Sequence, residues 1–139
     1  MAKKPMLLSR EDILRADDLP RELVDVEEWG GAVYVRGLTA AERDKFEASL
    51  FETKGKGPNA RQVFKGEDVR AKLAALTMVD AEGNRIFNDG DVKALAKKSA
   101  QALSRVYDVA SRLSGMTKED QEELEGNSDE TTDGDLSSD

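Results

Sequence analysis

The sequence predicts an α+β fold that is mainly helical, with one N-terminal β-hairpin packed against three to four helices. Apolar residues recur at helical spacing after capping patterns, and one short segment alternates apolar and polar residues around a double glycine. A C-terminal run of acidic and small polar residues predicts a disordered acidic tail. We therefore expect a flexible N-terminus over residues 1–8, a single α+β domain over residues 9–125, and the tail over residues 126–139.

A short helix is predicted at the start of the domain. Ser9 begins a pattern similar to a capping box, in which Asp12 takes the place of the usual glutamate or glutamine. The serine hydroxyl and this carboxylate are placed to accept hydrogen bonds from backbone N–H groups at the helix start. The helix is expected to continue to about Ala16, and Pro20 lies in the segment that ends it.

A β-hairpin is predicted next. Residues 22–29 and 32–36 alternate apolar and polar side chains, which is typical of strands that bury one face. Gly30 and Gly31 predict a two-residue turn between the strands, because glycine reaches positive φ angles at no steric cost. Trp29 precedes this turn, and we expect it to be either a core anchor at the hairpin end or an exposed contact residue.

The middle of the chain predicts two helices joined by a basic loop. Thr39 and Glu42 form a full capping box, which predicts a helix that continues to about Phe51. Residues 52–66 combine glycine, proline and basic side chains without the phosphate-binding pattern GxxxxGK, so a flexible solvated loop is expected. Residues 67–79 place their apolar side chains along one stripe, which predicts the second helix.

Residues 80–85 are predicted to form a turn. The segment superficially resembles a calcium-binding loop, which needs glycine at its sixth position and glutamate at its twelfth. Counting from Asp80, these positions are Arg85 and Asp91. We therefore expect a turn and no metal site.

The longest predicted helix begins at Asn88 or Asp89 and ends at about Leu113 or Ser114, with Gly115 as a left-handed cap. It is expected to be roughly 38 Å long, at about 1.5 Å per residue. Its apolar and small side chains fall within an arc of about 160°, and polar side chains fill the other side. Most of this stripe is expected to cover the hairpin and the middle helices, and one flank could remain for a helix of another molecule.

The composition argues against catalysis and against a membrane partner. The chain of 139 residues contains no cysteine and no histidine, which removes thiol nucleophiles, the commonest general base and the commonest metal ligand. No apolar run approaches the roughly 20 residues that cross a bilayer. The apolar stretch after the basic start is too short for a secretory signal. We predict a protein without enzymatic activity or cofactor that stays in the compartment where it is made.

The net charge of −8 is concentrated at the C-terminal end. Ten of the 29 acidic residues and none of the 21 basic residues lie between Glu119 and Asp139, so the rest of the chain has 19 acidic against 21 basic residues. An acidic protein repels nucleic acid phosphates, because binding them requires basic side chains in place of counterions. We therefore expect no nucleic acid partner.

Four segments together resemble a known protein family. They read VEEWGGAVYVRGLTAAERD over residues 26–44, MVDAEGNRIF over 78–87, KSAQALSR over 98–105 and LSGMTKED over 113–120. Their pattern and order are similar to those of tail assembly chaperones of long-tailed phages. The resemblance covers roughly residues 9–124.

This resemblance implies a helper of tail assembly that acts by binding. Chaperones of this kind bind the long, helical, apolar tape measure protein, keep it soluble, and help to recruit tail tube subunits, so that the major tail tube protein is a further expected partner. They act late, in the host cell cytoplasm, and leave before the virion is complete. The alternative is a structural virion component, such as a connector or tail accessory protein.

A shallow apolar surface on the long helix is the expected partner-binding site. Shielding a tape measure helix, or a second copy of this chain, requires apolar side chains that remain after the core is complete. The residues that we expect to contribute are Leu103, Val106, Tyr107, Val109 and Leu113, with Trp29 as a further candidate. No catalytic, metal-binding or cofactor-binding residue is predicted.

Overall fold

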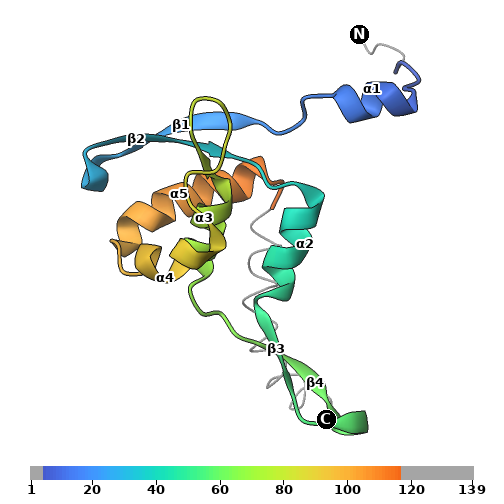
Figure 1. Ribbon diagram of the computed structural model, residues 1–139, viewed down its shortest axis with the longest axis vertical. Coiled ribbons are helices and arrows are strands. Elements are labelled where there is room, and N and C mark those ends of the chain that lie inside the picture. The colour runs from blue at the N-terminus through green and yellow to red at the C-terminus, as the bar shows by residue number, and fades with distance from the viewer. Residues whose placement is uncertain (1–4, 117–139) are drawn as a thin grey trace, which may run out of the picture.

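The computed structural model describes residues 5–116, which form five α-helices and two antiparallel sheets (Figure 1). The elements in chain order are α1 (Arg10–Arg15), β1 (Arg21–Val26), η1 (Glu27–Trp29), β2 (Gly31–Arg36), α2 (Ala40–Ala48), β3 (Phe51–Lys54), η2 (Gly57–Asn59), β4 (Arg61–Phe64), α3 (Val69–Thr77), β5 (Met78–Val79), η3 (Asp89–Asp91), α4 (Val92–Leu95) and α5 (Ala100–Leu113).

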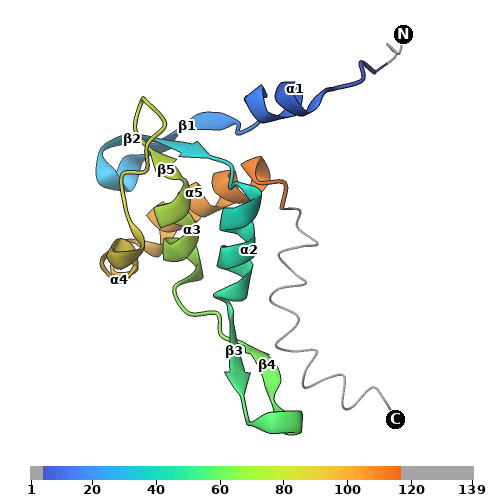
Figure 2. The same ribbon diagram turned by 45° about the vertical axis from the view of Figure 1, so that its right-hand side comes forward.

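The body of the protein is a small sheet packed on helices. Its three strands have the order β1-β2-β5, and α5 and α3 lie beneath them (Figures 1 and 2). Two segments extend from this body in both views: the N-terminal segment with α1 beside the sheet, and the β3–β4 hairpin below α2. The helices and the sheet therefore enclose one core, and the two extensions contribute little to it.

The first hairpin buries one face of each strand, as the alternating sequence predicts. Val24 pairs with Val33 across the strands, and Val24, Val26 and Val35 point into the core. The turn differs from the predicted two-residue type, because Val26 pairs directly with Gly31. The chain reverses through the 3-10 turn η1 and then Gly30, whose φ of 73° is in the left-handed region that glycine adopts without strain.

The core lies between this sheet and the helices. The largest fully buried side chains include Leu50 after α2, Leu73 on α3, Met78 on β5 and Val106 on α5. These residues are far apart in the sequence, and their burial removes apolar surface from water at a gain of about 25 cal/mol per Å². The core therefore joins segments from four different parts of the chain.

The predicted fold class is wrong in its arrangement. The prediction placed one hairpin at the N-terminus with three to four helices, whereas β1 begins only at Arg21 and α1 precedes it. A second sheet is also present, formed by β3 and β4 over most of residues 52–66, which were predicted to be a flexible loop. The rings of Phe51 and Phe64 meet edge to face, 5.7 Å apart, and stabilise the base of this hairpin.

The predicted long helix is also wrong, because the chain breaks it into separate pieces. After η3 and α4 the helix stops at Leu95, and α5 begins at Ala100 with Ser99 as its N-cap. The Ser99 hydroxyl accepts a hydrogen bond from the Ala102 N–H at 3.2 Å, so this serine starts a helix instead of continuing one. Leu95, at the end of α4, is also buried in the core.

Two predicted helix starts and one turn are confirmed. Ser9 and Thr39 each form a capping box with the acidic residue three positions later. Asp80 Oδ1 accepts the N–H groups of Glu82 and Asn84, which closes the predicted turn. The helix at Thr39 ends at Ala48, earlier than predicted. The pattern at Thr117 also predicts a last short helix to about Leu124; this segment and the predicted acidic tail, over residues 126–139, lie outside the described residues.

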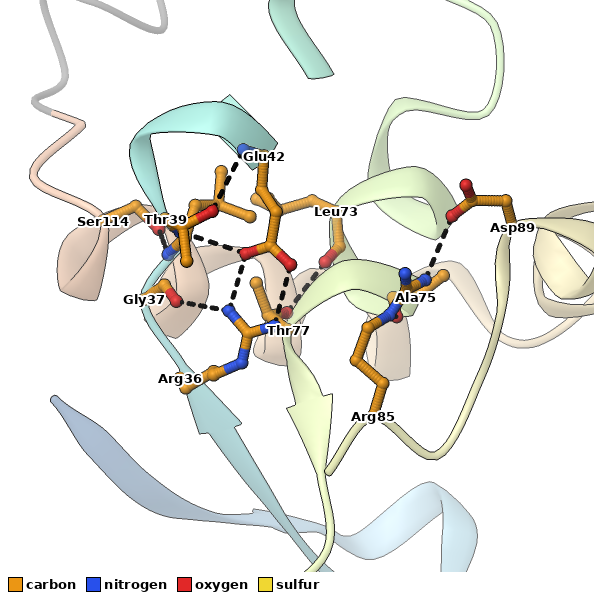
Figure 3. Close-up of polar contacts among 11 residues, drawn as sticks. Arg36, Gly37, Thr39, Glu42, Leu73, Ala75, Thr77, Arg85, Asp89 and Ser114 are labelled. Carbon is orange, nitrogen blue, oxygen red and sulfur yellow. Dashed lines mark hydrogen bonds and ion pairs between the residues drawn. The ribbon is translucent and has the colours of Figure 1, made fainter. Parts of the chain in front are cut away.

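One polar junction fixes the end of β2 to the start of α2 (Figure 3). The Arg36 guanidinium donates to both carboxylate oxygens of Glu42, at 2.7 and 2.9 Å, and to the Gly37 carbonyl at 2.8 Å. Glu42 also accepts the Thr39 N–H at 3.0 Å. These hydrogen bonds, with that from Arg36 the strongest, hold the pKa of Glu42 below its ordinary value. The neighbouring Leu38 N–H donates to the Ser114 hydroxyl, which attaches the end of α5 to the same junction.

Replacing Gly37 with alanine is expected to destabilise the protein by about 1–3 kcal/mol, the usual cost of overpacking. A Cβ atom at this position would lie 2.6 Å from the backbone carbonyl oxygen of Leu113, which cannot move without shifting α5. Urea unfolding followed by circular dichroism measures the change. Gly31→Ala is the control, since nothing lies within 4 Å of the added Cβ there. Equal stability of the two variants would contradict this close packing.

Glu42→Gln is expected to lower the free energy of unfolding by roughly 1–3 kcal/mol at pH 7, because it removes a charge-assisted pair while keeping a capping side chain. The pKa of Glu42 is lowered from 4.5 in the folded protein, so the stabilisation is complete above that value and is lost as the pH falls below it. The gap between wild type and variant should therefore shrink in acid.

The control for this pH dependence is Glu47→Gln. Glu47 pairs with Arg43 along one side of α2, and both side chains are more exposed than those of the Arg36–Glu42 pair. Exposed pairs of this kind contribute only about 0.3–0.5 kcal/mol. A gap that stays constant from pH 7 to pH 3 for Glu42→Gln would show that the ion pair adds nothing to stability.

Candidate partner-binding site

The structure separates the six predicted contact residues by burial. Leu103 and Val106 belong to the core, with 3% and 0% of their surface exposed. The other four are half-buried: Trp29, Tyr107, Val109 and Leu113. Of these, Trp29, Tyr107 and Val109 pack against the core from its margin. The apolar stripe on which the predicted binding site was based therefore packs largely against the core of the same molecule.

The apolar side chains of α5 are mostly buried because this helix lies under the sheet. α5 packs against β1, β2 and α3, and ion pairs attach its polar side to the first hairpin. Arg105 Nε donates to Glu28 at 2.9 Å, and Arg112 Nη2 donates to Glu22 at 2.9 Å. The hydrogen bond from Arg105 holds the pKa of Glu28 below its ordinary value. Contacts on several sides leave α5 with little free apolar surface.

A strongly exposed apolar segment lies instead at the N-terminal side. We call residues 5–19 the N-terminal arm. Its large apolar side chains are among the most exposed in the described part of the chain: Met6 80%, Leu7 95%, Leu8 56%, Ile13 57% and Leu14 68%. No residue of α1 is buried, yet the capping box of Ser9 and Asp12 fixes the helix locally. The arm thus presents two apolar side chains on a formed helix, Ile13 and Leu14, and three in the segment before it.

A concave apolar surface is formed by residues of α2 and α3, with one residue each from η3 and α4. We call it the α2–α3 groove. It has a volume of about 300 Å³ and is lined by Lys45, Phe46, Ser49, Lys72, Leu76, Asp89 and Val92. Phe46 lies almost fully buried, while Leu76 and Val92 remain partly exposed. The size and lining suit a few aliphatic side chains of a binding partner.

The polar residues of this groove favour an acidic or neutral partner. Two lysines, Lys45 and Lys72, stand beside the apolar lining, and the Lys72 ammonium donates to the Ser49 carbonyl at 3.0 Å. The single acid, Asp89, accepts from Arg85 Nη2 at 3.1 Å, and Arg85 Nε also donates to the Ala75 carbonyl (Figure 3). The groove residues together therefore carry a net positive charge.

Neither the exposed apolar arm nor the groove was predicted from the sequence. The apolar pair Ile13 and Leu14 in α1 is too short to show an amphipathic stripe, so nothing in the sequence indicated whether it would be covered. The groove combines residues from four separate elements, α2, α3, η3 and α4, which come together only in the folded chain. The apolar residues before the first strand were the only feature of the sequence that could have indicated an exposed apolar segment there.

Among residues 5–116, no three acidic side chains gather closely enough to hold a metal ion. Within the same residues, no helix has both the length and the apolar character needed to cross a bilayer.

Fold and surface together define a small α+β protein that offers apolar surface for binding. The profile of a protein family described as phage tail assembly chaperone matches residues 11–127, which is most of the chain. The chain belongs to the phage tail assembly chaperone family, and the resemblance seen in the sequence is confirmed. No curated protein and no solved structure matches the chain.

Proposed function

We propose that this chaperone binds the tape measure protein, keeps it soluble during tail assembly, and helps to bring tail tube subunits onto it. Membership of the family establishes a role in tail assembly. The partner and the mode of binding are the proposal. The α2–α3 groove is the observation that supports it most, because it is an apolar surface left open by the completed core.

The groove has the features of a site for an amphipathic helix. Such a helix places apolar side chains one turn apart, and these fit into a hydrophobic channel between two helices of the receptor. Leu76 on α3 and Val92 on α4 provide partly exposed apolar side chains, and the almost fully buried Phe46 also lines the groove. Lys45 and Lys72 at the margin would pair with acidic side chains on the polar side of the bound helix.

The half-buried residues of the predicted site extend this proposal. Trp29, Tyr107 and Val109 lie at the margin of the core, where their exposed parts add apolar contact area. Binding of this kind needs no chemistry, so the proposed activity is that of a helper without catalysis. We place it in the host cell cytoplasm, and expect the protein to leave before the virion is complete.

Co-expression with the tape measure protein of the same phage tests the groove. The double variant Leu76→Gln/Val92→Thr is expected to bind at least roughly tenfold more weakly, because one buried leucine contributes about 1.5–3 kcal/mol and each 1.4 kcal/mol is tenfold. The soluble fraction of the tape measure protein should fall accordingly. Leu23→Gln, an exposed position on β1, is the matched control. A soluble fraction unchanged by the groove variant, with its helical content intact, would refute the proposed site.

Quantitative mass spectrometry of purified phage particles tests the second part of the proposal. A chaperone that leaves before completion is expected to be absent from mature virions and present in lysates of infected cells. Detection at a fixed number of copies per particle, comparable to a known minor tail protein in the same sample, would favour a structural virion component instead.

A further inference from the structure

We propose that the N-terminal arm of one copy of this protein binds in the α2–α3 groove of a second copy. The same chain thus carries both an exposed apolar helix and an open apolar groove. A surface patch that complements a pocket elsewhere on the same molecule produces a head-to-tail contact between copies.

The arm has the properties of a segment that is covered in an assembly. Leu7 and Leu14 have 95% and 68% of their surface exposed to water. A contiguous segment of exposed large apolar side chains is unfavourable in water and is typical of a surface that another molecule covers. The helix α1 is nevertheless formed, since the Ser9 hydroxyl accepts from the Asp12 N–H at 3.1 Å and Asp12 accepts from the Ser9 N–H at 3.0 Å. A preformed helix loses less conformational entropy on binding than a disordered segment.

The groove matches the arm in size and charge. Its volume of about 300 Å³ equals that of roughly ten water molecules. Ile13 and Leu14 are consecutive residues of α1 and lie about 100° apart around its axis, so the groove has to hold only the one that faces it. Residues 10–18 contain two arginines and four acidic residues, a net charge of −2, and the groove presents Lys45 and Lys72. Opposite charges at the margin favour the encounter and fix its orientation.

A second copy is favoured over the same chain because the arm is directed away from its own groove. The Gly37 N–H donates to the Pro20 carbonyl at 3.1 Å, which fixes the base of the arm to the end of β2. Pro20 restricts the residue before it, Leu19, to extended conformations. From this base the arm runs away from α2, α3 and α4 in both views (Figures 1 and 2).

The arm and the tape measure helix would then compete for one groove. This consequence rests on the proposed function, whereas the contact between copies does not. An arm in the groove of a neighbour covers apolar surface on both copies until a client helix displaces it. The arm would therefore limit non-specific aggregation of the free chaperone.

Analytical ultracentrifugation of two complementary variants tests the contact. Ile13→Ser/Leu14→Ser removes the apolar arm and keeps the groove, while Leu76→Gln/Val92→Thr damages the groove and keeps the arm. Wild type is expected to exceed the monomer mass of 15.2 kDa as its concentration rises, reaching at least twice that value. Each variant alone should stay at the monomer mass. Their equimolar mixture should form a dimer and stop there, because it contains only one intact arm–groove combination.

A cross-linking experiment gives a second readout that does not depend on mutated contacts. The chain has no cysteine, so single cysteines can be placed at Leu14→Cys in one copy and Ser49→Cys in another. A short bismaleimide should yield a covalent heterodimer, and the pair Leu14→Cys with Leu23→Cys, at an exposed position on the sheet, should yield little.

Three results would overturn the proposal. These are a wild-type chain that remains monomeric at high concentration, variants that associate as wild type does, and cross-linking of Leu14→Cys to Ser49→Cys that is no greater than to Leu23→Cys. All measurements use this protein alone, so a failure to bind the tape measure protein would leave their outcome unaffected.

Discussion

The packing of α5 under the β1–β2 hairpin is the constraint on which the rest of the structure depends. Val106 is completely buried there, and the Leu113 carbonyl lies so close to Gly37 that no Cβ fits between them. Ion pairs from Arg105 and Arg112 hold the polar side of the helix against the first hairpin. Because α5 has the strongest amphipathic pattern and buries most of it, surface for partners must come mainly from apolar side chains elsewhere that the core leaves exposed.

Such side chains lie on the N-terminal arm and in the α2–α3 groove. The arm has no buried residue in α1, and the groove exposes parts of Leu76 and Val92 at the margin of the core. A member of the tail assembly chaperone family needs this division of roles. Under the proposed function, stable packing around α5 keeps the body folded, while the arm and the groove would bind and release a partner without unfolding it. Exposed apolar side chains also create a hazard of aggregation, which a reversible contact between copies would reduce.

The correct and incorrect parts of the sequence-based prediction have physical causes. The capping boxes at Ser9 and Thr39 were predictable because each depends on two side chains within one turn of the helix. The β3–β4 hairpin was missed because its strands have only four residues and its tip is rich in glycine. The Phe51–Phe64 contact that holds it joins positions thirteen residues apart, which no local pattern reveals. The break at Ser99 was missed because serine also fits the small-residue stripe of a continuous helix.

The sequence by itself determined the local elements, the charge distribution and the family, since these depend on neighbouring residues and on their order along the chain. Only the tertiary structure decided which apolar residues remain exposed. Leu103 and Leu14 are both leucines on helices, yet the first is in the core and the second in water. Their difference arises from what lies opposite each helix, and that is set by the packing of distant segments. For a binding protein, this difference determines the candidate site.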